Sequence, residues 1–339
     1  MSAPTIRIEG PWFEDFEVGD DFSDVPAVTL TEGHAALHQA AFGDRLRLPL
    51  DQVLCSRVTG EHRLLANPSL VANMAIGQST LPSQRVMGNL FYRGLCFRQP
   101  VFIGDTLTTK TRVVALKQNK IREGRPASGM VALEIHVLNQ HEETILRFWR
   151  CPMIPCRDPN ADTGRNDDLS LLPEALEGLE DNLPNWSLGV FRQSVRADHG
   201  ESLVEGQAWM IDARDTVTLA PEIVRMTLNL AMTHTDGQRS VYGKRLVYGG
   251  HTIAMAAAQL SRALPGLVTI AGWYRCDHLA PVFEGDVLQT RLVIGRKQAL
   301  DKGYLVDIEV TVSALGGDSS PEPGKEVDVL SWHLCGLFA

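Results

Sequence analysis

Two stretches without Lys, Arg, Asp or Glu, residues 64–84 and 246–261, divide the hydrophobic pattern of the chain into two similar halves. Each is long enough for a helix, and the lack of a charged face is typical of a helix buried on all sides. Each is followed by segments rich in β-branched and aromatic residues that alternate apolar and polar positions. The pattern therefore predicts one buried helix and a run of antiparallel strands in each half.

A repeated octapeptide fixes the relation between the halves. Pro-Val-Phe-x-Gly-Asp-x-Leu begins at Pro100 and again at Pro281, an offset of 281 − 100 = 181. At the same offset, LANPSLVANMA from Leu65 falls on LVYGGHTIAMA from Leu246, so the two central helices occupy equivalent places. In the octapeptide itself we expect Gly to adopt a positive φ and Asp to bond the turn backbone, which is a folding role.

Between the halves lies a segment dense in Pro, Asp, Asn and Gly, which is typical of a linker. We therefore predict an N-terminal domain over 1–155, a linker over 156–185 with one short helix at 171–179, and a C-terminal domain over 186–339. Four or five antiparallel strands wrapped around one buried helix form the hotdog fold. The prediction is an α+β double hotdog of two tandem domains.

Composition narrows the function classes. The chain has 339 residues with a net charge of −9, 44% hydrophobic and 22% charged residues, as expected for a protein that buries a large core. The negative charge argues against nucleic-acid and anionic-membrane partners, and Asn and Pro within 64–84 argue against a membrane span. Six cysteines without a CxxC pair indicate reduced thiols and a cytoplasmic location, and no His, Asp or Cys spacing suggests a metal site.

Upstream of each central helix, similar segments end on an aspartate. VTLTEGHAALHQAAFGD from Val28 ends at Asp44, and VTLAPEIVRMTLNLAMTHTD from Val217 ends at Asp236. The aspartates are 236 − 44 = 192 residues apart, so the second half has 192 − 181 = 11 fewer residues between its aspartate and its central helix. We expect the two halves to share a plan and to differ around a pocket.

These segments resemble a known family. FEDFEVGD from Phe13, TLTEGHAALHQAAFGDRLRL from Thr29 and NLAMTHTDGQRSVYGKRLVYGGHT from Asn229 resemble the MaoC-like (R)-specific enoyl-CoA hydratases, in the double-hotdog branch of mesaconyl-CoA (2-methylfumaryl-CoA) hydratases. The resemblance covers the chain outside the linker. It implies a hydratase/dehydratase that adds water to the α,β-double bond of a short, branched or dicarboxylic enoyl-CoA. The acyl-CoA thioester is the substrate, and no cofactor or metal is implied.

The family signature is Gly-Asp-x-Asn-Pro-Leu-His, with Asp and His as the catalytic dyad, followed by His-Gly where the central helix begins. The first half has Gly43-Asp44 but has Pro49 at the His position. At its helix entry, Pro68 lacks an N–H that could serve the oxyanion hole. This half is therefore expected to shape the acyl pocket without catalysing. Neither Asp44 nor Asp236 is followed by His five residues later. The second half is the expected catalytic half.

The resemblance implies the following roles there. The expected acid and base are Asp236 with His234 or His251. The amides of Gly249 and Gly250 are expected to form the oxyanion hole. Further substrate-binding candidates are Tyr248, Asp44, Arg45 and Arg245. If Arg45 or Arg245 points inward, it could clamp a second carboxylate or meet CoA phosphates; otherwise it is a solvated charge.

Structural interpretations of the same residues remain open. Asp236 could be a helix cap, and His251 a buried core histidine. His278 could bond its neighbour Asp277 on a strand, or the pair could approach the pocket. Thioester hydrolysis and non-catalytic acyl-CoA binding are the alternative functions, and both a monomer and a homodimer fit the sequence.

Overall fold

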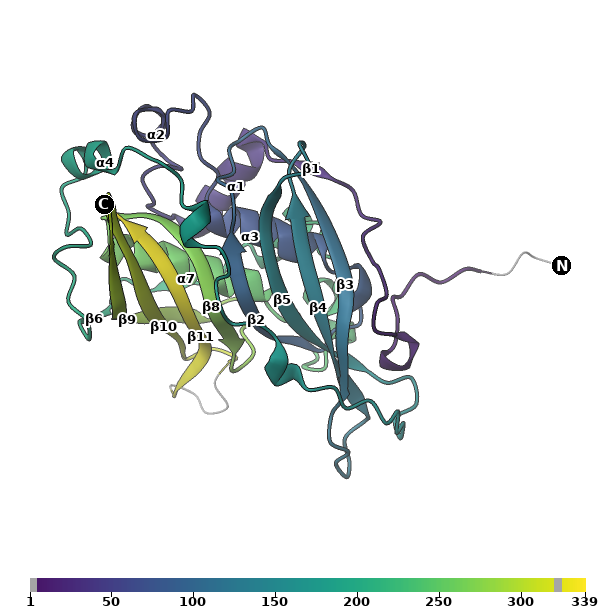
Figure 1. The fold of residues 1–339 in the computed structure, drawn as a ribbon. Helices are drawn as coiled ribbons and strands as arrows, with labels where there is room; N and C mark the ends of the chain where they lie inside the picture. Colours follow the sequence, from purple (N-terminus) through teal and green to yellow (C-terminus); the bar gives the residue numbers. More distant parts are fainter. Residues whose placement is uncertain (1–4, 320–324) are drawn as a thin grey trace.

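The computed structural model describes residues 5–319 and 325–339, and within them eleven strands form one continuous antiparallel sheet (Figure 1). The first half supplies β1 (Val28–Thr29), β2 (Gly88–Phe97), β3 (Thr106–Gln118), β4 (Ser128–Leu138) and β5 (Thr144–Pro155). The second supplies β6 (Ala208–Met210), β7 (Asp215–Thr216), β8 (Leu267–His278), β9 (Val287–Leu300), β10 (Gly303–Leu315) and β11 (Glu326–Phe338). The strand order is β1-β3-β4-β5-β2-β8-β11-β10-β9-β6, with β7 beside β9.

The halves are joined at the seam between β2 and β8. These strands pair antiparallel, with Tyr92 opposite Cys276 and Leu95 opposite Trp273. Two hotdog sheets therefore continue into one another, and one hydrophobic core runs through both halves. The predicted α+β double hotdog is confirmed.

Two buried helices cross one face of this sheet. These are α3 (Pro68–Gln78) and α7 (Gly249–Ala263), and they pack against each other (Figure 1). Every residue of α3 is buried, and its start is fixed by Pro68 in the first turn and by the Asn67 side chain, which accepts the Ser69 N–H. Helix α3 lies within the first charge-free stretch, and α7 begins in the second and ends two residues beyond it, so the predicted central helices are confirmed.

Further helices complete the halves. They are α1 (Glu32–Phe42), α2 (Gln52–Thr59), α4 (Leu188–Ser194), α5 (Ala220–Met226) and α6 (Met232–Thr235). Of these, α1 packs against α3, α5 and α7, while α2 packs against α4. The described helices include none long and apolar enough to cross a bilayer.

The linker crosses the sheet face opposite the central helices (Figure 1). A Cβ on Gly94 of β2 would lie 2.7 Å from the Pro173 carbonyl oxygen, and one on Gly272 of β8 would lie 2.9 Å from the Leu176 side chain. The predicted helix at 171–179 is wrong: the segment has 3₁₀ turns at Leu169–Leu171 and Glu180–Asn182 instead. Pro173 and Gly178, which has φ +69°, account for the interruption.

The repeated octapeptide forms two equivalent turns. Gly104 and Gly285 have φ +103° and +94°. The carboxylates after them accept backbone N–H bonds within the turn, Phe102 to Asp105 at 2.8 Å and Phe283 to Asp286 at 2.7 Å. The expected folding role is confirmed at both positions.

Candidate active site

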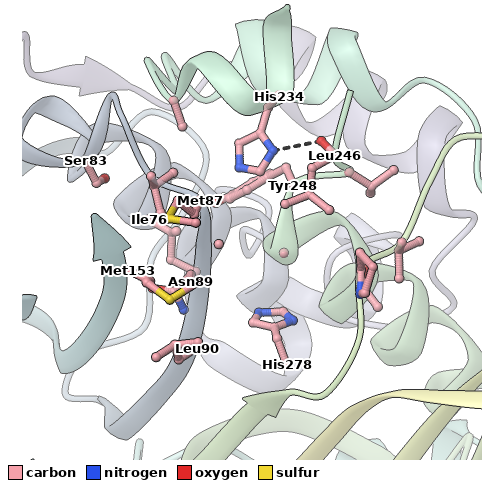
Figure 2. Close-up of a pocket in the computed structure, with 18 of the residues that line it drawn as sticks. Ile76, Ser83, Met87, Asn89, Leu90, Met153, His234, Leu246, Tyr248 and His278 are labelled. Carbon is pink, nitrogen blue, oxygen red and sulfur yellow. Dashed lines mark hydrogen bonds between the residues drawn. The ribbon is translucent and has the colours of Figure 1, made fainter. Parts of the chain in front are cut away.

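A cavity of about 200 Å³ lies where the two halves meet. One wall comes from α3, β2 and β5; the other comes from residues 229–252 and from the end of β8. Its polar lining includes Arg150, Asn229, His234, Tyr248 and His278, and the described lining residues include no aspartate or glutamate. Figure 2 shows His234 and His278 on opposite sides of the cavity.

The backbone after α5 repeats the geometry found after α1. Gly43 (φ +61°) ends α1, and the next residue, Asp44, accepts the Leu46 N–H at 2.9 Å. After α5, Leu228 takes the same left-handed conformation (φ +56°), and the next residue, Asn229, accepts the Ala231 N–H at 2.9 Å. Asn229 is therefore the counterpart of Asp44, at an offset of 229 − 44 = 185.

This equivalence corrects the predicted pairing of Asp44 with Asp236. The segment from Asn229 to the second central helix is 4 residues shorter than the segment from Asp44 to the first, since 185 − 181 = 4. The predicted difference of 11 residues is therefore wrong. Five residues after Asn229 stands His234, whereas five residues after Asp44 stands Pro49. The signature's Asp-to-His spacing of five was the missed signal: the second half retains the histidine and has an amide in place of the aspartate.

His234 presents a free ring nitrogen to the cavity. Its Nδ1 lies 2.8 Å from the Leu246 carbonyl oxygen, so Nδ1 carries the proton and donates it, which leaves a lone pair on Nε2 (Figure 2). Burial lowers the pKa of His234 to about 4. The imidazole is therefore neutral at pH 7, with Nε2 unprotonated.

His278 faces His234 from the end of β8. Its Nε2 is buried without a hydrogen-bond partner, and burial lowers its pKa to about 4. The ring packs against Tyr92, with centroids 5.8 Å apart. The predicted bond between His278 and Asp277 does not form, because successive side chains of a strand point to opposite faces. Asp277 Oδ1 instead accepts a hydrogen bond from Arg93 Nη2 at 2.7 Å.

Only some of the residues at the start of α7 line the cavity. Tyr248 and Gly249 line it, and a Cβ on Gly249 would lie 2.5 Å from His278 Nε2. The Tyr248 hydroxyl donates to the Asn73 carbonyl at 3.0 Å. Gly250 does not line the cavity: a Cβ there would lie 2.0 Å from Asn73 Oδ1, so this glycine allows α7 to pack on α3.

Asp236, Arg45 and Arg245 do not reach the cavity. Asp236 is exposed, and its Oδ1 accepts the Gln238 N–H at 2.9 Å, so it caps a 3₁₀ turn as the structural interpretation proposed. Arg245 is exposed and ion-paired with Glu284 at 2.9 Å. The Arg45 side chain is also exposed, and only its backbone N–H is fixed, by Ser261 Oγ.

Asp44 instead belongs to a first-half cluster formed with His38, Asn67 and Ser69. Asn67 Nδ2 donates to Asp44 Oδ2 at 2.9 Å, Ser69 Oγ donates to Asn67 Oδ1 at 2.7 Å, and His38 Nε2 lies 3.0 Å from Ser69 Oγ. All four side chains are buried and bonded to one another. Helix α1, which carries His38, packs against α7, and the cluster does not line the cavity.

His251 faces this first-half side and not the cavity. Its ring meets Phe42 edge-on with centroids 4.8 Å apart, and both ring nitrogens are buried without a partner. Burial lowers its pKa to about 3, as it does for His38. Of the two histidines proposed as partners in the dyad, only His234 reaches the cavity.

No group of three His, Cys, Asp or Glu side chains within the described ranges is arranged to hold a metal ion. The six cysteines are buried and form no disulfide. The chemistry that these residues offer is proton transfer between the imidazoles and a bound molecule.

The sheet, the two central helices and the seam cavity define a double-hotdog protein. Among solved structures, Rv0216 of Mycobacterium tuberculosis, described as having a double hotdog fold, has a TM-score of 0.87 and 42% identity, covering 98% of this chain and 99% of that one. A putative MaoC domain dehydratase from Chloroflexus aurantiacus has a TM-score of 0.84 and 25% identity, covering 99% of both chains.

Similarity to curated proteins shows the family to which the chain belongs. β-Methylmalyl-CoA dehydratase of Chloroflexus aurantiacus is 30% identical over 318 residues, 88% of this chain and 86% of that protein. Mesaconyl-CoA hydratase of Cereibacter sphaeroides is 26% identical over 318 residues, covering 88% and 85%. No protein-family model matches the chain. The chain therefore belongs to the MaoC-like double-hotdog hydratases and dehydratases.

Proposed function

We propose that this protein adds water to, and removes it from, the α,β-double bond of a short, branched enoyl-CoA. The observation that carries the proposal is the pair of neutral imidazoles, His234 and His278, that face one cavity with a free nitrogen each. The cavity is smaller than the roughly 300–1,000 Å³ of a typical ligand pocket, which suits a short acyl group. Two relatives are named for this type of reaction.

In the hydration direction, His234 Nε2 accepts a proton from a water molecule while the water oxygen forms a bond to the β-carbon. The imidazolium returns that proton to the α-carbon, so no proton is gained or lost overall. His278 Nε2 bonds the same water and orients it. The chemistry needs proton transfers alone, and we propose that it proceeds without a cofactor.

Two neutral groups would complete the site. Asn229 Nδ2 is buried without a partner and can donate a hydrogen bond to the water, but an amide cannot serve as the base. Gly249 begins the 15-residue helix α7, whose N-terminus favours the negative charge that develops on the thioester oxygen. In the proposed mechanism the base of this protein is therefore the His234 imidazole, in place of the signature aspartate.

The test is a hydration assay of the purified protein with mesaconyl-CoA, crotonyl-CoA and a longer enoyl-CoA. We expect loss of the enoyl absorbance and formation of the hydroxyacyl-CoA with the branched C5 substrate. Release of free thiol without hydroxyacyl-CoA would instead support a thioesterase. Tight binding of the CoA esters with no conversion would support a non-catalytic acyl-CoA-binding protein, and either result would overturn the proposal.

A further inference from the structure

Arg150 places a buried positive charge in the cavity wall without a counter-ion. It lies on β5, its exposed fraction is 3%, and it lines the cavity. Within the described residues, 5–319 and 325–339, the ion pairs up to 4.0 Å include none with Arg150. A guanidinium stays charged in proteins, and a buried charge without a partner is unfavourable, so this position favours an anionic ligand.

The hydrogen bonds of Arg150 leave part of the guanidinium available. Nη2 donates to the Ser79 carbonyl oxygen and to Ser83 Oγ, each at 2.7 Å, and both acceptors are neutral. Nε is buried and has no partner. These two bonds hold the side chain in place, while a planar group with five donors keeps others for a carboxylate.

The rest of the lining supports an anion rather than opposing it. The described lining residues include no carboxylate, and Asn229 Nδ2 is a second buried donor without a partner. Arg150 is near enough to His234 for its charge to contribute to the lowered pKa of that imidazole. The cavity therefore combines a fixed cation from the first half with the imidazole from the second.

We propose that Arg150 binds a free carboxylate on the acyl group of the substrate. The site would then select dicarboxylic acyl-CoA esters of four or five carbons over uncharged ones of the same length. The inference rests on the proposed function for its catalytic consequence, but not for the binding selectivity. It transfers to Arg150 the carboxylate-clamp role that the sequence suggested for Arg45 and Arg245, whose side chains are exposed.

Equilibrium binding tests this without requiring turnover. Succinyl-CoA and butyryl-CoA have acyl chains of four carbons and differ in a terminal carboxylate against a methyl group. We expect isothermal titration to show succinyl-CoA binding about 100-fold more tightly, and Arg150→Met to remove that preference. Arg147→Met is the matched control, because Arg147 lies on the same strand, half-exposed and paired with Glu134; it should leave the preference unchanged.

Equal affinities in the unchanged protein would overturn the inference. So would an equal weakening of both ligands by Arg150→Met, since that would place Arg150 against the shared CoA moiety. Thermal unfolding identifies any variant that fails to fold, and Arg150→Lys, which keeps the charge without the planar fork, should retain part of the preference. Selective binding without hydration of any enoyl-CoA would refute the proposed function and leave the assignment of Arg150 intact.

Discussion

The two halves of the chain build the same backbone turn and use it in opposite ways. After α1, Asp44 lies in a cluster whose buried side chains bond to one another. After α5, its counterpart Asn229 lies beside a cavity with its Nδ2 unpaired, next to imidazoles that also have free nitrogens. A polar cluster closed on itself stabilises a fold, whereas donors and acceptors left open toward a cavity are available to a ligand.

The largest expected difference between the halves is at the position five residues after each turn. His234→Ala should lower kcat/KM for enoyl-CoA hydration about 1,000-fold, because the proposed base is lost. Pro49→Ala, at the equivalent first-half position, should change kcat/KM less than twofold. Steady-state kinetics on both variants measures this, and a comparable loss in both would show that the first half takes part in catalysis.

The opposite pattern is expected for Asp44→Ala. This variant leaves the Leu46 N–H and Asn67 Nδ2 without their acceptor in a buried cluster, so the free energy of unfolding should fall by about 2–4 kcal/mol. Below the unfolding transition, kcat/KM should stay within twofold of the unchanged protein. Urea unfolding followed by circular dichroism gives the first quantity; an activity loss with unchanged stability would contradict the division of roles.

His251 should make the free energy of unfolding depend on pH. Its pKa is about 3 in the folded state and about 6.5 in the unfolded state, so between these values only the unfolded chain takes up the proton. Stability is therefore present above about pH 6.5 and is lost as pH falls toward 3. Lowering the pH from 7 to 5 should reduce the free energy of unfolding by about 2 kcal/mol through this residue. His251→Leu should remove that part of the dependence of the unfolding free energy on pH. Urea titrations at both pH values measure it, and an unchanged pH dependence in the variant would refute the buried, neutral state.

The smallest effect is expected at Asp236. Because the side chain is exposed and caps a 3₁₀ turn, Asp236→Asn should change kcat/KM less than twofold and the free energy of unfolding by less than about 0.5 kcal/mol. The same kinetic assay measures it. A loss of activity approaching that of His234→Ala would restore Asp236 to the catalytic site.

The repeat made most of the fold predictable. An offset of 181 aligned the turns at Gly104 and Gly285 and the central helices, because these features depend on local sequence. The linker helix was predicted wrongly, since Pro173 and Gly178 interrupt it. The pairing of β2 with β8, which creates the cavity, is a contact between distant segments that no local pattern contains.

Three residues that the sequence indicated as site candidates, His234, Tyr248 and Gly249, line the cavity, and their catalytic and binding roles stay predictions. The register of the second half was predicted wrongly. A left-handed backbone conformation is usually found at glycine, but here Leu228 adopts it. The equivalence of Leu228-Asn229 and Gly43-Asp44 could therefore not be recognised from the sequence. Arg150 lay outside every motif, and only the tertiary structure shows that it is buried without a carboxylate partner.

The seam between β2 and β8 has an evolutionary consequence. When two identical subunits pair by a twofold axis, every substitution appears in both, so one site cannot change without the other. Joining the halves in one chain removes that constraint and also keeps the two walls of the cavity together at any dilution. In this chain the first half has Pro49 at the position where the second half has His234, and the first half supplies Arg150 to the shared cavity. A symmetric dimer does not allow this division of roles.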